Sequence, residues 1–254
     1  MENLKFRCSS LSDVANGKSG LTTVQEKNLN DLLSKIKLTD KQAETRDELI
    51  SKRDAPITLS QTGISKVETI IKQMIYGYEL QIDNKYVNKG IRMEDEAIKL
   101  LSLHSGNNYS KNEKYFQNDF ITGTPDIIHN NKIIDIKCSW NKSTFPLFKD
   151  DAHSTLYEYQ MRGYMMLTGC DSAEVTYCLM TTPDDLISYQ KTNGEKVYSE
   201  SPDLHNMEDL DLRLRFTTIT YERDLEIEKQ IIEKVKVARD YANEFYNKIM
   251  FKLM

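Results

Sequence analysis

The stretch that decides the fold is Gly123-Thr-Pro-Asp-Ile-Ile-His-Asn-Asn-Lys-Ile-Ile-Asp-Ile-Lys137. It contains two β-rich runs, residues 124–129 and 132–139, which are separated by Asn130 and Asn131. Two adjacent asparagines between apolar runs favour a tight hairpin turn, because asparagine tolerates the positive φ angles of such turns. The stretch therefore predicts two antiparallel strands joined by a two-residue turn.

Three ionisable side chains converge in this hairpin. Asp126 lies at the start of one strand, whereas Asp135 and Lys137 are two residues apart and project from the same face of the other strand. The neighbouring isoleucines predict a buried strand, and buried charges need a partner. Two carboxylates suit a hard cation such as Mg²⁺, and an ammonium group beside them can position a water for attack on a phosphodiester.

The rest of the chain shows helical periodicity before the hairpin and mixed periodicity after it. Thr39 and Gln42 predict a capping box at the start of one helix. The polar residues 183–211 favour a surface insertion over a core element. The order α, βββ, α, β, β, α predicts an α/β (α+β) fold. The expected helices are 39–52, 61–75, 85–103, 154–168 and 224 onward, and the further expected strands are 115–121, 173–180 and 213–221.

Composition narrows the class of protein. The 254 residues are 39% hydrophobic and carry a net charge of −5. This charge argues against a protein that wraps nucleic acid with a uniformly basic surface, but it is compatible with a local basic groove. No run approaches the ~20 apolar residues that cross a bilayer, and residues 1–20 lack a signal-peptide core, so we expect a soluble, cytoplasmic protein. The four cysteines and four histidines lack metal-binding spacing, so any metal needs oxygen ligands.

The hairpin resembles the core of the PD-(D/E)xK nuclease superfamily. The resemblance rests on Asp126 after Gly-x-Pro, nine residues before the Asp-x-Lys tripeptide that begins at Asp135. Upstream, Gly90-Ile-Arg-Met-Glu94-Asp-Glu-Ala97 is similar to the carboxylate helix of the phage lambda exonuclease and YqaJ-type viral recombination nucleases, with Glu94 as the matching acid. The resemblance implies a restriction-endonuclease-like core, in which a central mixed β-sheet is flanked by helices.

Two further segments resemble this branch. The run Ser154 to Gly169 contains the family's Tyr-x-x-Gln pattern as Tyr157 and Gln160. The run Arg53-Asp-Ala-Pro-Ile-Thr-Leu-Ser60 is similar to the family's Arg and Ser at the entry to a helix. In the family this Arg and Ser, with the Gln, bind the 5′ phosphate of a DNA end, so the resemblance assigns Arg53, Ser60 and Gln160 to that phosphate, with Tyr157 among the DNA-binding residues. A guanidinium fork and helix N-terminal amides suit a phosphate dianion.

The resemblance implies a Mg²⁺-dependent deoxyribonuclease, with Mn²⁺ as a substitute ion. Asp126, Asp135 and the backbone carbonyl of Ile136 would hold the metal, and Glu94 would complete the site directly or through water. Lys137 would orient or deprotonate the attacking water. We expect no nucleotide cofactor. We also expect no iron–sulfur cluster, because the iron–sulfur branch needs a cysteine cluster near the C-terminus and no cysteine lies beyond residue 178.

The family also implies a 5′ to 3′ exonuclease on double-stranded DNA ends in phage-type recombination, in the host cytoplasm if the chain is phage-encoded. A single-strand annealing protein is the implied partner, and a trimeric ring is the family's assembly. We expect residues 1–50 to form a helical N-terminal extension and residues 51–254 the nuclease domain, with the polar insertion at 183–211.

Three alternatives stay open. An endonuclease specific for a structure or a sequence, built on the same core, would cut closed circular DNA. A non-catalytic recombination accessory protein would bind DNA without forming product. A protein unrelated to DNA would use Asp126, Asp135 and Lys137 only as an ion network on a strand surface.

Overall fold

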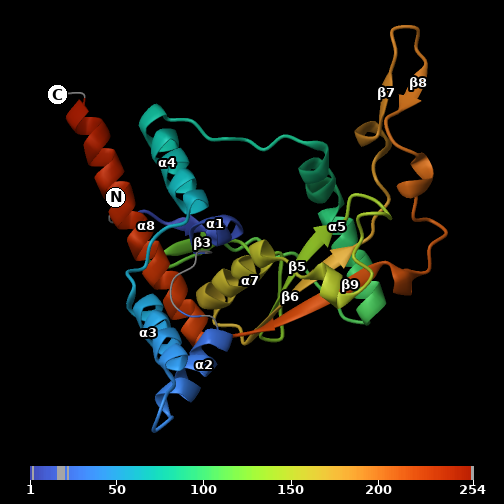
Figure 1. Ribbon diagram of the computed structural model, residues 1–254. Coiled ribbons are helices and arrows are strands. Elements are labelled where there is room, and N and C mark those ends of the chain that lie inside the picture. The colour runs from blue at the N-terminus through green and yellow to red at the C-terminus, as the bar shows by residue number, and fades with distance from the viewer. Residues whose placement is uncertain (2, 16–20, 22, 253–254) are drawn as a thin grey trace. The chain divides into compact units, whose positions relative to one another are not determined.

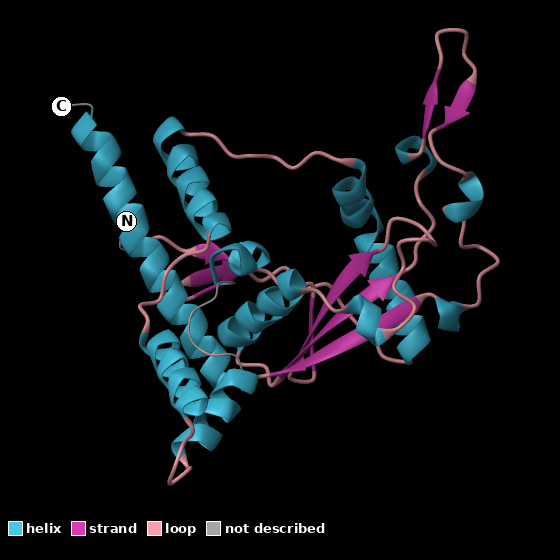
Figure 2. Ribbon diagram, viewed as in Figure 1, coloured by secondary structure: helices cyan, strands magenta, loops and turns pink. Residues whose placement is uncertain are grey.

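The computed structural model describes residues 1, 3–15, 21 and 23–252 and mixes helices with short and long strands (Figure 1, Figure 2). The predicted α/β class is confirmed. The helices are α1 (Leu11–Ala15), α2 (Thr23–Leu33), α3 (Asp40–Asp54), α4 (Gln61–Tyr76), α5 (Lys85–Ser105), α6 (Lys149–Ala152), α7 (Thr155–Thr168) and α8 (Leu225–Lys252). The strands are β1 (Phe6–Arg7), β2 (Phe116–Gln117), β3 (Ile121–Gly123), β4 (Ile127–His129), β5 (Lys132–Cys138), β6 (Ser172–Cys178), β7 (Ser188–Gln190), β8 (Lys196–Tyr198) and β9 (Phe216–Glu222).

The chain forms two compact units. The helical unit comprises residues 1–4, 13–76 and 229–254, and the sheet unit comprises residues 5–12 and 77–228. These units do not coincide with the predicted division at residue 50. Residues 5–12 belong to the sheet unit, where β1 pairs in parallel with β3. The expectation of a wholly helical start is therefore wrong at β1, because a two-residue strand is too short to show a periodic pattern.

The helical unit is built from amphipathic helices. Leu29 and Leu32 of α2 pack against Leu49 of α3, and α3 begins at the predicted capping box between Thr39 and Gln42. The α4 and α8 helices are linked by Tyr241, whose hydroxyl donates to Glu68 Oε1 at 2.8 Å. Among the described residues, no helix combines the length and the apolar composition needed to span a membrane.

The sheet unit contains the predicted mixed sheet, in the strand order β4-β5-β6-β9. β4 is antiparallel to β5, β5 is parallel to β6, and β6 is antiparallel to β9. Ile134 and Ile136 of β5 pack against Ala97 and Leu101 of α5. Because side chains alternate along a strand, the intervening residue, Asp135, faces the other side, where α7 lies. The two helices thus cover opposite faces of β5 (Figure 1).

The predicted hairpin is confirmed. Its turn consists of Asn130 and Asn131, which both adopt positive φ, and the strands pair from His129 with Lys132 outward. The strand expected over 115–121 is mostly wrong. Phe116 and Gln117 form β2 and Ile121 begins β3. Between them the Asn118 side chain accepts hydrogen bonds from two following backbone amides and makes a turn.

The polar stretch 183–211 is only partly at the surface. Its β7–β8 hairpin is exposed and projects from the rest of the sheet unit (Figure 1). However, Ile187, His205 and Met207 are buried, so the expectation that this stretch avoids the core is wrong for these residues. His205 is accommodated because its ring nitrogens meet Thr182 Oγ1 at 2.9 Å and Glu200 Oε2 at 3.1 Å.

A buried lysine ties α5 to the ends of two strands. Lys89 Nζ donates to the backbone oxygens of Ser139, Trp140 and Met180 and to Thr182 Oγ1, all at 2.7–2.8 Å. Burial lowers the pKa of Lys89 to about 8, and the four acceptors stabilise its ammonium form at neutral pH. This contact holds α5 against the segments that follow β5 and β6.

Replacing Lys89 by methionine should destabilise the protein by about 2–4 kcal/mol, because four buried acceptors lose their donor. The free energy of unfolding in urea measures the effect. Lys99→Met is the matched control, because Lys99 lies on the same helix with an exposed side chain and should change stability by less than ~0.5 kcal/mol. Equal stability of the two variants would contradict the assigned role.

Candidate active site

The carboxylates of the hairpin lie side by side, as the sequence pattern predicts. Asp126, just before β4, accepts a hydrogen bond at 2.8 Å from the backbone amide of Ile136 on β5. The Asp135 side chain is only 1% exposed, and its Oδ2 lies 2.6 Å from Lys137 Nζ. Two acids and one ammonium group are thus held together by the pairing of two adjacent strands.

In the group formed by Asp126, Asp135 and Lys137, two carboxyl groups are matched by a single ammonium group. Burial and the neighbouring Asp135 raise the pKa of Asp126 to about 8. Burial alone would lower the pKa of Lys137, but the attraction of Asp135 raises it above its ordinary value. One lysine therefore faces one buried and one partly buried carboxylate, and a hard cation would relieve the remaining repulsion.

Oxygen donors suitable for such a cation are present. Asp135 Oδ2 is buried, and its approach to Lys137 lacks hydrogen-bond geometry, so the oxygen has no hydrogen-bond partner among the residues that the structure describes. Two carboxylates and the nearby Ile136 carbonyl match the hard ligands that Mg²⁺ and Mn²⁺ take. The hairpin residues therefore fit a divalent cation in their chemistry.

Glu94 lies on α5 within electrostatic range of Asp126, whose pKa it helps to raise. Its Oε1 lies 2.9 Å from Lys111 Nζ. In the part of the chain that the structure describes, no three His, Cys, Asp or Glu side chains converge closely enough to hold a metal. Glu94 therefore stands beside the hairpin carboxylates, engaged by a lysine of its own.

The α7 helix presents Gln160 and Tyr157 to the site. Gln160 Nε2 donates to Asp135 Oδ1 at 3.3 Å and to Tyr164 Oη at 3.0 Å, and Lys137 Nζ donates to Gln160 Oε1 at 3.5 Å. Lys137 Nζ also lies 4.6 Å from the centre of the Tyr157 ring. The two residues of the Tyr-x-x-Gln pattern thus contact the hairpin charges directly.

Arg53 and Ser60 belong to the helical unit, whereas Gln160 and Tyr157 belong to the sheet unit. Arg53, in the last turn of α3, bonds both carboxylate oxygens of Asp54, at 2.8 and 3.2 Å. Ser60 Oγ accepts from the Gly63 amide at 3.1 Å at the start of α4. Each of these two residues thus has a local structural partner, and their assignment to a 5′ phosphate stays a prediction.

A cavity that the sequence did not reveal lies within the sheet unit. Its volume is about 470 Å³. Thr124 in its wall is two residues before Asp126, and Tyr164 in its wall bonds Gln160. The sequence does contain one signal for this cavity, because Arg7 and Ser9 lie just before a helix. Both residues fall within residues 1–50, which we expected to form an N-terminal extension outside the nuclease domain. The lining residues are Arg7, Cys8, Ser9, Glu79, Tyr115, Thr122, Gly123, Thr124 and Tyr164.

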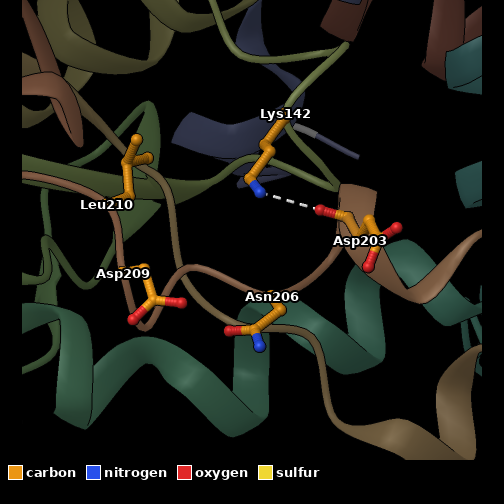
Figure 3. Close-up of a pocket in the computed structure, with 5 residues that line it drawn as sticks. All are labelled: Lys142, Asp203, Asn206, Asp209 and Leu210. Carbon is orange, nitrogen blue, oxygen red and sulfur yellow. Dashed lines mark hydrogen bonds between the residues drawn. The ribbon is translucent and has the colours of Figure 1, made fainter.

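Another cavity, of about 340 Å³, shares no lining residue with the first (Figure 3). Lys142 Nζ in its wall donates to the backbone oxygen of Asp203 at 2.8 Å. This bond joins the loop after β5 to residues 183–211, which indicates a structural role. The lining residues are Lys142, Asp203, Asn206, Asp209 and Leu210.

Comparison with solved structures finds relatives over nearly the whole chain. A phage-related exonuclease from Haemophilus somnus 129PT is 30% identical, with a TM-score of 0.72 and 97% of each chain covered. The alkaline exonuclease LHK-Exo from Laribacter hongkongensis is 15% identical, with a TM-score of 0.57 over 99% of this chain and 94% of that chain. LHK-Exo in complex with dAMP gives a TM-score of 0.54 at 15% identity, over 96% of this chain and 95% of that chain. No family model and no curated protein matches.

The fold and the 30% identity to an exonuclease over nearly the whole chain define a nuclease. The chain belongs to the phage-related exonucleases of the lambda exonuclease, YqaJ-type family within the PD-(D/E)xK superfamily. The match to the Haemophilus protein covers nearly all of both chains, so the first fifty residues have a counterpart in at least one relative.

Gly123→Ala should disturb this site by crowding Tyr164. A Cβ at Gly123 would lie 2.6 Å from Tyr164 Cε1 and 3.1 Å from Cys8 Sγ, which requires the ring that bonds Gln160 to move. We expect a loss of about 1–3 kcal/mol in unfolding free energy and slower DNA degradation. Gly90→Ala is the control, since a Cβ there meets nothing within 4 Å and helix propensity favours alanine. A Gly123→Ala protein as stable and active as wild type would refute this account.

Proposed function

We propose that this protein is a Mg²⁺-dependent deoxyribonuclease that degrades double-stranded DNA from its 5′ ends. One observation carries the proposal: Asp126 and Asp135 lie side by side, with Lys137 Nζ 2.6 Å from Asp135, in a chain that is 30% identical to a phage-related exonuclease. Pairs of carboxylates that hold a divalent cation beside a lysine suit phosphodiester hydrolysis.

The roles follow from the positions of the side chains. Asp126, Asp135 and the Ile136 carbonyl would hold the cation, and Glu94 would complete its shell directly or through water. When bound, the cation supplies a Lewis acid to the phosphodiester. Lys137 donates to the attacking water and offsets the negative charge that develops on the phosphate. Gln160 fixes the Asp135 carboxylate through its side-chain amide.

Two sets of residues are candidates for the terminal 5′ phosphate. The family pattern favours Arg53 and Ser60 together with Gln160. The cavity beside the hairpin favours a second set, Arg7 and Ser9, because one guanidinium and a hydroxyl line a space of about 470 Å³ that reaches to within two residues of Asp126. LHK-Exo, which shares the fold, has been solved in complex with dAMP, a nucleoside monophosphate, which supports the proposal of a phosphate-binding site. The trimeric ring and the annealing-protein partner stay predictions.

The activity is tested by digesting linear duplex DNA beside covalently closed circles, in Mg²⁺ or EDTA. We expect Mg²⁺-dependent loss of the linear DNA alone, and Lys137→Ala should slow it by about 10²–10³-fold, because a donor to the developing charge is removed. Lys132→Ala is the matched control, since Lys132 lies on the same strand but pairs with Glu174 at 2.5 Å. Cut circles would indicate an endonuclease, and DNA binding without product would indicate an accessory protein.

The phosphate site is tested by comparing 5′-phosphorylated and 5′-hydroxyl duplexes. Wild type should prefer the phosphorylated end, and the variants that line the true site should lose that preference. The two pairs to compare are Arg7→Gln with Ser9→Ala, and Arg53→Gln with Ser60→Ala. If both pairs keep the full preference, neither set binds the terminal phosphate, whereas loss in one pair alone assigns the site.

A further inference from the structure

Lys111 stands between the candidate active site and solvent. Its Nζ lies 2.9 Å from Glu94 Oε1 and 3.3 Å from Asp95 Oδ1. The Lys111 side chain is 43% exposed, whereas that of Glu94 is 25% exposed. The ammonium group thus neutralises an acid of the site while remaining accessible from outside.

The backbone next to Lys111 is tied to the catalytic hairpin. The Asn112 amide donates to the backbone oxygen of Asp126 at 2.7 Å, and Asn112 Nδ2 donates to the backbone oxygen of Pro125 at 2.9 Å. Asn112 Oδ1 in turn accepts from the Lys114 amide at 3.2 Å. These bonds hold the backbone next to Lys111 against the backbone of Pro125 and Asp126.

Among the described residues, Glu94 pairs with Lys111 and does not join the hairpin carboxylates in a metal-binding cluster. Each of two acids at the site is held by a lysine, Asp135 by Lys137 and Glu94 by Lys111. A half-exposed ion pair contributes little free energy. A dication bound to Asp126 and Asp135 would attract Glu94 more strongly than a single ammonium group does, because it carries twice the charge.

We infer that Lys111 competes with the divalent cation for Glu94, and that cation binding releases Lys111 to contact a DNA phosphate. The inference rests on the proposed metal site. Lysine suits this exchange, because its compact charge sits on a flexible four-carbon stem and needs no fixed bidentate partner. Asp95, which is 70% exposed, keeps the released ammonium group at the rim of the site. Cation binding and DNA binding would thus be coupled through one side chain.

The competition is tested by titrating Mn²⁺ into the DNA-free protein by isothermal calorimetry. Lys111→Met should bind Mn²⁺ about two- to fivefold more tightly than wild type, because an exposed ion pair no longer opposes binding. Lys114→Met is the matched control, since Lys114 is a nearby exposed lysine that lies 4.8 Å from the centre of the Phe116 ring. In a Glu94→Gln background the Lys111 effect should vanish, because the shared partner is absent.

The release is tested by DNA affinity at several salt concentrations, with Ca²⁺ or with EDTA and a duplex protected by phosphorothioate linkages. In Ca²⁺, Lys111→Met should lower the slope of log affinity against log salt by about 0.9, the loss of one phosphate contact. In EDTA its slope should equal that of wild type, because Lys111 is then held by Glu94. An unchanged slope in Ca²⁺ would refute the release.

The outcomes separate this inference from the proposed function. If Asp126→Asn binds Mn²⁺ as wild type does, or if wild type binds none, the proposed metal site fails and the inference fails with it. If Asp126→Asn abolishes binding but Lys111→Met binds no more tightly than wild type, only the competition is refuted. Thermal melts of each variant in EDTA confirm that it is folded before titration.

Discussion

The central constraint in the sheet unit is the close approach of two acids on one hairpin, one of them buried and the other partly buried. Asp126 and Asp135 are held next to each other by backbone pairing, which does not depend on their charge. Burial and, after it, the repulsion of Asp135 raise the pKa of Asp126, whereas Lys137 opposes this rise. The packing of the sheet unit therefore stabilises a pair of neighbouring acids that is electrostatically unfavourable by itself. Such pairs are common at active sites.

The surrounding elements hold this hairpin from both faces. On one face, α5 packs its apolar side on the isoleucines of β5, and Lys89 secures α5 to the strand ends. On the other face, α7 brings Gln160 to Asp135. Gly163 of α7 allows Cys8 to approach this helix closely, because a Cβ at Gly163 would lie 2.7 Å from Cys8 Sγ. The segment at Cys8 is thus packed against α7, the helix that supports the site.

Two lysines, which differ in burial, place positive charge next to the acids. Lys137 is mostly buried, shares a strand with Asp135 and is held by Gln160 as well. Lys111 is on a loop, with its side chain half in solvent. A buried lysine on a strand is suited to a fixed role at the phosphate, whereas an exposed lysine on a loop is suited to exchanging partners. The cavity lined by Arg7 and Ser9 is also lined by Thr124, two residues before Asp126.

The sequence by itself determined the features that depend on neighbours in the chain. The Asn130-Asn131 turn, the capping box at Thr39 and the common face of Asp135 and Lys137 follow from local geometry. Tertiary structure alone decided the rest. The pairing of β1 with β3, the burial of Lys89 and His205, and the meeting of Lys111 with Glu94 join residues distant in the chain. No local pattern encodes such contacts, because they depend on how whole elements pack.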